Sequence, residues 1–206
     1  MRPSREAVMT ALFNTLVSSV QTSFTADTTI SSTILSTPSV SDGLFVGLPV
    51  FGSGIQRGSV IESLSPLTLS LPVTSDGAAV LMTTGFLTFS RRLKKWQDVT
   101  SQPALFLRDA PEEVEYPNII LQRLTMKAEI WIYSNAGQDS SIAPSTGLNN
   151  LLDAVQLALS PDDVMTQRFT LGGLVEWCRI SGKIEKEPGD LDGQAIAVAD
   201  VEITVP

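Results

Sequence analysis

The chain has 206 residues, of which 43% are hydrophobic and 17% charged, with a formal net charge of −8. This balance argues against a disordered chain, and the length suffices for one large domain or two small ones with a sizeable core. Because there is no histidine and one cysteine, Ser-His-Asp and Cys-His catalysis, histidine-based zinc sites and an internal disulfide are excluded. The acid excess argues against a general nucleic-acid-binding surface, which needs clustered Lys and Arg.

The first segment predicts an amphipathic helix, with Ser4 as its N-cap after Pro3. Its apolar face consists of Val8, Leu12 and Leu16, widened by Met9, Phe13 and Val17. A signal peptide also places basic residues before apolar ones, but Glu6, Thr10 and Asn14 interrupt the apolar region and no cleavage motif is clear. No apolar run approaches the roughly 18 residues that a membrane span requires.

From about Thr22 to Gly85 the composition changes, because Ser, Thr and Gly become frequent and charges become rare. Short β-prone runs alternate there with Gly, Pro and Asp turn signals; the runs are "TISSTIL", "LFVGLPV", "SVIESL", "LTLSLP" and "AAVLMTT". We expect residues 22–85 to form a small all-β module.

This module contains the glycine-rich stretch Gly47–Leu64, "GLPVFGSGIQRGSVIESL". A Walker loop needs GxxxxGK[ST], and a dinucleotide loop needs GxGxxG between a strand and a helix. Here the lysine is absent, Gly54 and Gly58 are one residue too far apart, and the following segment is β-prone. Turns between short strands account for these glycines, so no phosphate site is expected.

The remainder predicts strands and a second helix. Three strands are expected first, at Phe86–Ser90, Pro103–Arg108 and Ile119–Tyr133, followed by a helix from Leu148 to Leu159 that Pro161 stops. A strand at Phe169–Ile184, bent near Gly182, then leads through an acidic turn to a final strand. One face of that final strand consists of Ala195, Ala197, Ala199, Val201, Ile203 and Val205. The predicted fold class is α+β, with an antiparallel β-sheet packed against two α-helices.

Two carboxylate clusters precede the acidic turn: Glu112, Glu113 and Glu115, and Asp162 with Asp163. Neighbouring residues diverge on regular structure, so we expect solvated loop and helix-end charges instead of a catalytic pair. No EF-hand calcium loop is present. Cys178 lies in an apolar strand and is expected to be a core residue.

The one basic cluster is "RRLKKW", with Arg91, Arg92, Lys94 and Lys95 preceding Trp96. It is either a solvated strand end with a tryptophan beneath it or a contact surface for an acidic partner, including another copy of this chain. Trp131 and Tyr133 fall on the polar face of the long predicted strand, where exposed aromatic side chains suggest an interface.

Five segments carry a likeness to a known family: "REAVMTALFNTL", "FLTFSRRLKKWQDVTSQPALFLRDAPEE", "QRLTMKAEIWIYSN", "LNNLLDAVQLAL" and "GGLVEWCRISGKIEKEPGDLDGQAIAVADVEITV". Together they resemble the tail terminator, or tail-completion, proteins of long-tailed bacteriophages. The resemblance covers most of residues 1–21 and 86–206 and rests on the order and style of the segments. Residues 22–85 depart from it, which implies an inserted β-rich domain that projects outward.

The resemblance implies a structural virion protein that catalyses no reaction and needs no cofactor or metal. Such subunits form a closed ring of typically about six copies, here a homohexamer in the tail neck. The ring ends growth of the tail-tube protein and joins the tail to the head-tail connector or stopper, after assembly in the host cytoplasm and without a membrane. DNA passes through the lumen without specific binding.

Two surfaces are assigned on this basis. Arg91, Arg92, Lys94, Lys95, Trp131 and Tyr133 are expected at the subunit interface, while the acidic turn with Glu185, Glu187, Asp190 and Asp192 is expected to face the lumen or the tube. The alternatives are a tail-tube, decoration or adhesive protein whose β insertion binds a partner or a cell surface, and a carboxylate-only enzyme such as a glycosidase.

Overall fold

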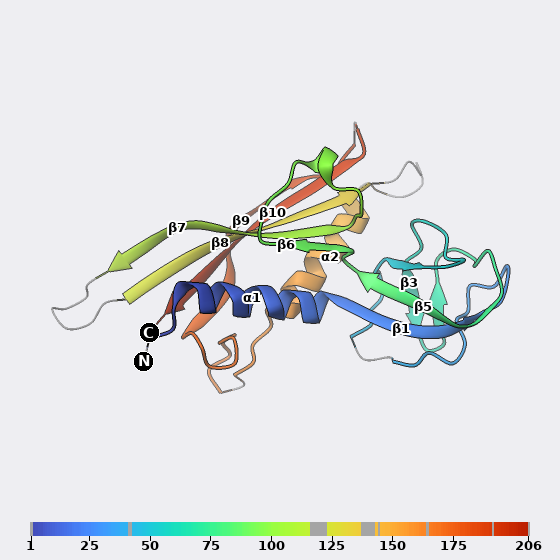
Figure 1. The fold of residues 1–206 in the computed structure, drawn as a ribbon, viewed down its shortest axis with the longest axis horizontal. Helices are drawn as coiled ribbons and strands as arrows, with labels where there is room; N and C mark the ends of the chain where they lie inside the picture. The colour runs from blue at the N-terminus through green and yellow to red at the C-terminus, as the bar shows by residue number, and fades with distance from the viewer. Residues whose placement is uncertain are drawn as a thin grey trace.

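The computed structural model describes residues 2–40, 43–115, 123–136, 143, 145–163, 165–190 and 192–205. Within these residues the fold is α+β, because two α-helices accompany sheets whose strands pair mostly antiparallel (Figure 1). Neither helix of the described ranges combines the length and the apolar content needed to cross a membrane.

The first helix, α1 (Arg5–Val20), forms as predicted. Ser4 caps it, because the Ser4 hydroxyl accepts a hydrogen bond of 3.1 Å from the backbone N–H of Ala7. Its buried face consists of Val8, Met9, Leu12, Leu16 and Val20. Gln21 then takes extended dihedrals, φ −134° and ψ 126°, so the helix passes directly into strand β1 (Gln21–Thr28).

Residues 21–85 form two small sheets. Strand β5 (Gly77–Gly85) lies between β1 and β2 (Val50–Gly52), while β3 (Ile61–Leu64) and β4 (Leu67–Leu69) form a hairpin. The runs "SVIESL", "LTLSLP" and "AAVLMTT" thus contain strands, as predicted. Gly47, Gly54 and Gly58 take positive φ in turns before β3, as the turn interpretation requires.

The strand predicted at "TISSTIL" is wrong. The chain turns there, with Ser31 at φ 63°, and the first strand is β1 instead. Strand β1 was missed because its sequence "QTSFTADT" is largely polar. Its pairing with β5 nevertheless buries Phe24, Ala26 and Thr28 on one face.

The larger sheet has five strands in the order β6-β7-β8-β10-β9. They are β6 (Thr88–Ser90), β7 (Ala104–Glu115), β8 (Arg123–Asn135), β9 (Trp177–Glu187) and β10 (Gln194–Val205). Strands β8 and β10 stay in antiparallel register from Leu124 opposite Val205 to Asn135 opposite Gln194. The predicted antiparallel sheet has one exception, because β6 runs parallel to β7.

One face of this sheet forms the core with both helices. The predicted inward residues of β8 and β10 are all buried: Leu124, Met126, Ala128, Ile130, Ile132, Ala195, Ala197, Ala199, Val201, Ile203 and Val205. The second helix, α2 (Ser145–Ala158), packs against α1, β8 and β10 through Leu148, Leu151, Leu152, Ala154 and Val155. The same apolar cluster continues into residues 21–85, including Phe24, Leu48 and Met82.

The strand predicted from Phe169 is wrong in its first half, because β9 begins only at Trp177. Gly172 and Gly173 have positive φ, which a strand does not accommodate. Asp162 fixes this turn by accepting the N–H groups of Thr170 and Gly172. The predicted bend is confirmed, since Gly182 has φ 72° and the pairing of β9 with β10 shifts register between Ser181 and Glu185.

The paired ends of strands β7 and β8 extend past the N-terminal end of α1 (Figure 1). Residues 108–115 and 123–127 are here called the arm, and Glu112 of the arm pairs with Arg5 of α1. The prediction that Glu112, Glu113 and Glu115 lie in a loop is wrong, because β8 supplies a pairing partner and β7 continues through them. All three are exposed, as expected. The pairing shifts register between Ala110 and Glu113, around Pro111. Residues 119–122 of the predicted long strand lie outside the described residues.

The first and last residues of the β-rich part, Gln21 and Gly85, lie next to each other. Gln21 and Gly85 are partners across β1 and β5, and the Gln21 side-chain amide donates a 2.7 Å hydrogen bond to the Phe86 carbonyl. Gly85 has φ 80°, and a Cβ there would collide with the Val20 carbonyl oxygen. A glycine is therefore required where the two chain segments touch.

We expect Gly85→Ala to lower the free energy of unfolding by about 2 kcal/mol or more, because the left-handed backbone and the Val20 carbonyl both oppose a methyl group. Chemical denaturation measures the change. The control is Gly147→Ala in α2, where a Cβ meets nothing within 4 Å. It should be neutral or stabilising by up to about 1 kcal/mol. Equal stability of the two variants would contradict the expectation.

Candidate interaction surface

The face of the five-stranded sheet turned away from the helices, here called the open face, combines charged and apolar side chains. Cross-strand pairing places Arg179 beside Glu202, Asp200 beside Glu129, and Val198 beside Trp131. Trp131, Val198 and Ile196 are only partly buried. An uncovered sheet face with half-exposed apolar groups is a surface suited to protein contacts.

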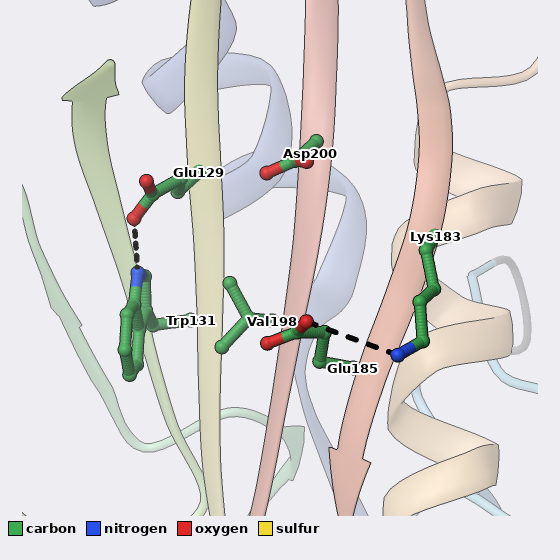
Figure 2. A pocket seen from close by; sticks show the side chains of 6 residues that line it. All are labelled: Glu129, Trp131, Lys183, Glu185, Val198 and Asp200. Carbon is green, nitrogen blue, oxygen red and sulfur yellow. Dashed lines mark hydrogen bonds and ion pairs between the residues drawn. The ribbon is translucent and has the colours of Figure 1, made fainter.

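A shallow pocket of about 280 Å³ lies on this face, lined by Glu129, Trp131, Lys183, Glu185, Val198 and Asp200 (Figure 2). The Trp131 indole N–H donates a 2.8 Å hydrogen bond to Glu129. Arg108 lies 3.6 Å from the same carboxylate, and Lys183 lies 3.9 Å from Glu185. Trp131 was predicted for the subunit interface and Glu185 for the acidic turn, whereas the other four lining residues were not predicted, because only the strand register brings the six together.

The pocket offers charged groups and an aromatic surface, and its Glu129 carboxylate is already held by Trp131 and by Arg108 beside the pocket. Within the described ranges, no group of three or more His, Cys, Asp and Glu side chains is arranged to hold a metal ion. The arrangement is suited to docking a polar or cationic group of a partner against Trp131.

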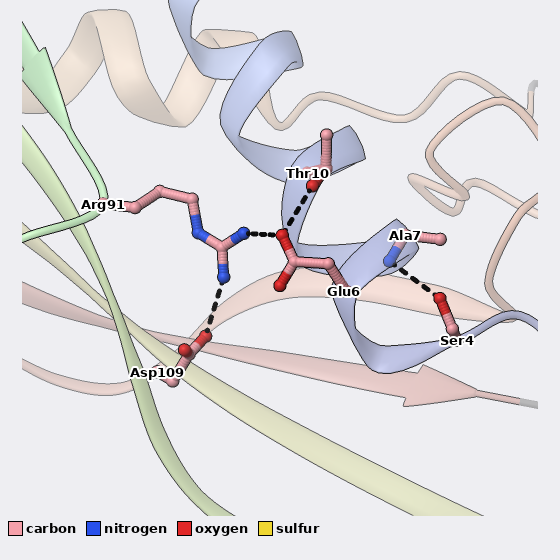
Figure 3. Close-up of polar contacts among 6 residues, drawn as sticks. All are labelled: Ser4, Glu6, Ala7, Thr10, Arg91 and Asp109. Carbon is pink, nitrogen blue, oxygen red and sulfur yellow. Dashed lines mark hydrogen bonds and ion pairs between the residues drawn. The ribbon is translucent and has the colours of Figure 1, made fainter.

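The basic loop, Arg91–Trp96, follows β6, and its first residue is committed to the chain itself. Arg91 donates through Nη1 to Glu6 of α1 and lies 3.5 Å from Asp109 of β7 (Figure 3). This hydrogen bond, with one of 3.1 Å from Thr10, holds the pKa of the Glu6 carboxyl below its ordinary value. Arg91 therefore ties α1 to the sheet and is not free for a neighbouring subunit.

The other three cations of the loop are exposed. Arg92, Lys94 and Lys95 have no ion-pair partner within the part of the chain that the structure describes. Their backbone is fixed from below, because Leu93 and Trp96 pack on a second apolar cluster formed by Val99, Ala104, Phe106 and Tyr133. The short 3₁₀ helix η1 (Trp96–Asp98) closes the loop.

Tyr133 is the support of this loop, and the prediction that it is exposed is wrong. Only 4% of its surface is accessible, and its hydroxyl donates a 3.0 Å hydrogen bond to the Lys94 carbonyl. Its ring packs against Phe106 at 5.2 Å between centroids. Burial raises the pKa of the Tyr133 phenol. The alternation of β8 was right, but the loop of residues 91–99 covers this end of the open face.

The acidic turn connects β9 to β10. Glu185 and Glu187 belong to the end of β9, while Asp190 and Asp192 lie in the turn itself; all four are exposed. Asp192 also accepts a 2.9 Å hydrogen bond from the N–H of Gln194, which fixes the start of β10. The placement of this turn in a lumen stays a prediction.

Two remaining candidates have structural roles. Cys178 is fully buried, and burial, with the nearby Asp162 charge, raises the pKa of its thiol to about 12. Burial alone would raise the pKa of Asp162, but the N–H groups of Gly172 and Thr170 hold it below its ordinary value. Asp163 accepts the N–H groups of Met165 and Thr166.

No known family model matches this chain, and no curated protein sequence does either.

We expect Tyr133→Phe to lower the free energy of unfolding by about 1 kcal/mol, because the Lys94 carbonyl loses a buried donor while the ring contacts remain. Amide hydrogen exchange should accelerate within residues 92–99. The control is Ser23→Ala, which removes an exposed hydroxyl paired with Thr83 and should change stability by less than about 0.5 kcal/mol. Unchanged exchange in the loop would contradict the supporting role of Tyr133.

Cys178 should resist alkylation by iodoacetamide at mildly alkaline pH in the folded protein, because the raised pKa leaves almost no thiolate and the side chain is buried. The unfolded chain in urea should react fully, and intact-mass spectrometry distinguishes the two states. Rapid labelling of the folded protein would instead mark an accessible, reactive thiol.

Proposed function

We propose that this chain is a structural subunit of a bacteriophage virion, a tail terminator that forms a ring at the head-proximal end of a long tail. The ring, typically of about six copies, ends growth of the tail tube and joins the tail to the head connector. Its partners are other copies of itself, the tail-tube protein and the connector or stopper protein. The role is structural, not catalytic.

The observation that carries the proposal is the junction of Gln21 with Gly85. Because the two ends of residues 22–85 are adjacent, residues 1–21 and 86–206 can be regarded as one continuous unit. In that unit α1, the β7–β8 hairpin, α2 and the β9–β10 hairpin follow one another in the order that the resembling segments imply. On this proposal, residues 22–85 are an insertion into a terminator subunit.

The surfaces of the unit support a role in assembly. The open face, the basic loop and the projecting arm all present charged groups beside partly buried apolar ones. The acidic turn is exposed at one end of the sheet, and the net charge of −8 repels DNA phosphates. A subunit of this kind suits a channel that lets DNA pass without holding it.

A second candidate function is a tail-tube, decoration or adhesive protein whose β-rich part binds a partner. It is favoured by the exposed large apolar side chains, because six of the nine found in the described residues lie in residues 22–85: Ile30, Ile34, Val40, Val46, Leu64 and Leu81. Scattered exposed apolar residues are common on monomers, so this observation ranks second to the junction.

The test is the copy number and position of this chain in intact particles of the phage that encodes it. Quantitative mass spectrometry against the tail-tube protein gives the number, and imaging of labelled particles gives the position. About six copies at the head-tail junction are expected for a cyclic ring. Dozens of copies along the tail or over the capsid would support the second candidate, and absence from particles would overturn both.

A further inference from the structure

The few cations of this chain are used unevenly. Arg5, Arg91, Arg108 and Arg179 form ion pairs within the chain. Arg92, Lys94 and Lys95, in contrast, stand together on the basic loop without an ion-pair partner among the described residues. In a protein of net charge −8, copies repel one another unless a basic patch meets an acidic one. The basic loop is therefore the surface on which the acidic groups of a second copy would bind most favourably.

The loop is stiff enough to act as a docking site. The Tyr133 hydroxyl holds the Lys94 carbonyl, and Leu93 and Trp96 anchor the backbone on either side of it. Preorganised charges lose less entropy when a partner binds than charges on a flexible loop. The three cations thus form a fixed surface of one sign.

The acidic complement is the far end of the arm. Glu113 and Glu115 are exposed and have no ion-pair partner within the described ranges, whereas Glu112 is taken by Arg5. Val114, between them in sequence, leaves 40% of its surface exposed. The arm's end thus combines two exposed carboxylates with an apolar side chain, and Arg123 of β8 is the strand partner of Glu115.

One chain cannot bring these two surfaces together. Lys94 of the basic loop lies at the start of β7, because its carbonyl meets Tyr133, the strand partner of Ala104, whereas Arg91 reaches Asp109 near the middle of that strand. Glu115 lies at the far end of β7, roughly 35 Å from Ala104 along the strand, so Lys94 and Glu115 of one chain lie far apart. Opposite charges at opposite ends favour a head-to-tail contact between copies, which closes into a ring when the rotation permits.

We propose that the arm of one copy docks on the basic loop of the next, with Glu113 and Glu115 facing Arg92, Lys94 and Lys95. This inference rests on the proposed function only in that the contacts close into a ring. The contact between two copies does not depend on a role in a phage. It assigns the partner surface for the basic loop and leaves Arg91 and Tyr133 as supports inside each subunit.

The test uses two charge-reversed forms of the full chain. The loop variant is Lys94→Glu with Lys95→Glu, and the arm variant is Glu113→Lys with Glu115→Lys. The loop variant keeps Arg92 but has a net negative charge on both its loop and its arm, and the arm variant has basic residues on both surfaces. Each variant alone should therefore associate at least about tenfold more weakly than wild type in sedimentation at low salt. An equimolar mixture should regain association, because each variant's arm then meets the other's loop.

Two misfolded variants could not regain association when mixed. Recovery in the mixture would therefore show that each variant alone failed because of its charges and not because of a folding defect. Arg57→Glu and Glu62→Lys, which reverse exposed charges in residues 22–85, are the controls and should associate as wild type does. Circular dichroism is the check that all forms fold. Wild-type association should also weaken as salt rises.

A carbodiimide cross-link provides the second readout, because it joins a lysine to a carboxylate only in contact. In an equal mixture of ¹⁴N and ¹⁵N chains, Lys94 or Lys95 should be joined to Glu113 or Glu115 of the other isotope. Association without these links and without rescue would overturn the docking while leaving the ring intact. A wild-type chain that stays monomeric at millimolar concentration and low salt would overturn it as well. Copy number in particles tests the neck role separately.

Discussion

The structure depends on the unbroken register between β8 and β10. Twelve residue pairs, from Leu124 opposite Val205 to Asn135 opposite Gln194, keep period-two alternation without a shift. Since a slip of one residue would turn every apolar side chain outward, this pairing fixes which face the helices cover. Three inward residues of β10 are small, namely Ala195, Ala197 and Ala199, and all three are fully buried on the face that meets the helices.

The same alternation determines where function can lie. Once one face is committed to α1 and α2, the opposite face must carry the remaining side chains, and β9 and β10 place Arg179, Glu202 and Asp200 there. The loop of residues 91–99 covers only the end of that face near Tyr133. The pocket around Trp131, the basic loop itself and the arm are the charged surfaces that these contacts leave exposed.

Much of this was predictable from the sequence, for a physical reason. The helices α1 and α2 and the strands β8 and β10 have long, strict periodicity, so burial decides both their type and their inward faces. Strand β1 escaped prediction because its partner β5 supplies the apolar neighbours that its own sequence lacks. The start of β9 was misplaced because "FTLGGLVEW" is apolar enough for a strand, yet two glycines at positive φ and the Asp162 hydrogen bonds make it a turn.

The interaction surface was predictable only as residue types. Arg91 forms ion pairs within its own chain, whereas Lys94 and Lys95 form none with the described residues. The difference depends on Glu6 and Asp109, which are 85 and 18 residues away from Arg91 in sequence. Likewise, the burial of Tyr133 depends on a loop 39 residues away. Local pattern identifies a charged cluster, but tertiary contacts decide which of its members remain for a partner.

The position of residues 22–85 fits an assembly through the arm. In Figure 1 this part lies beyond the C-terminal end of α1, at the other end of the molecule from the arm. A neighbouring copy that takes the arm on its basic loop therefore approaches the end away from residues 22–85. Because Gln21 and Gly85 are adjacent, residues 22–85 add no break to the five-stranded sheet, although Phe24, Leu48 and Met82 share its apolar core. On the proposed docking, substitutions on the exposed surface of residues 22–85 therefore leave the spacing between arm and loop unchanged.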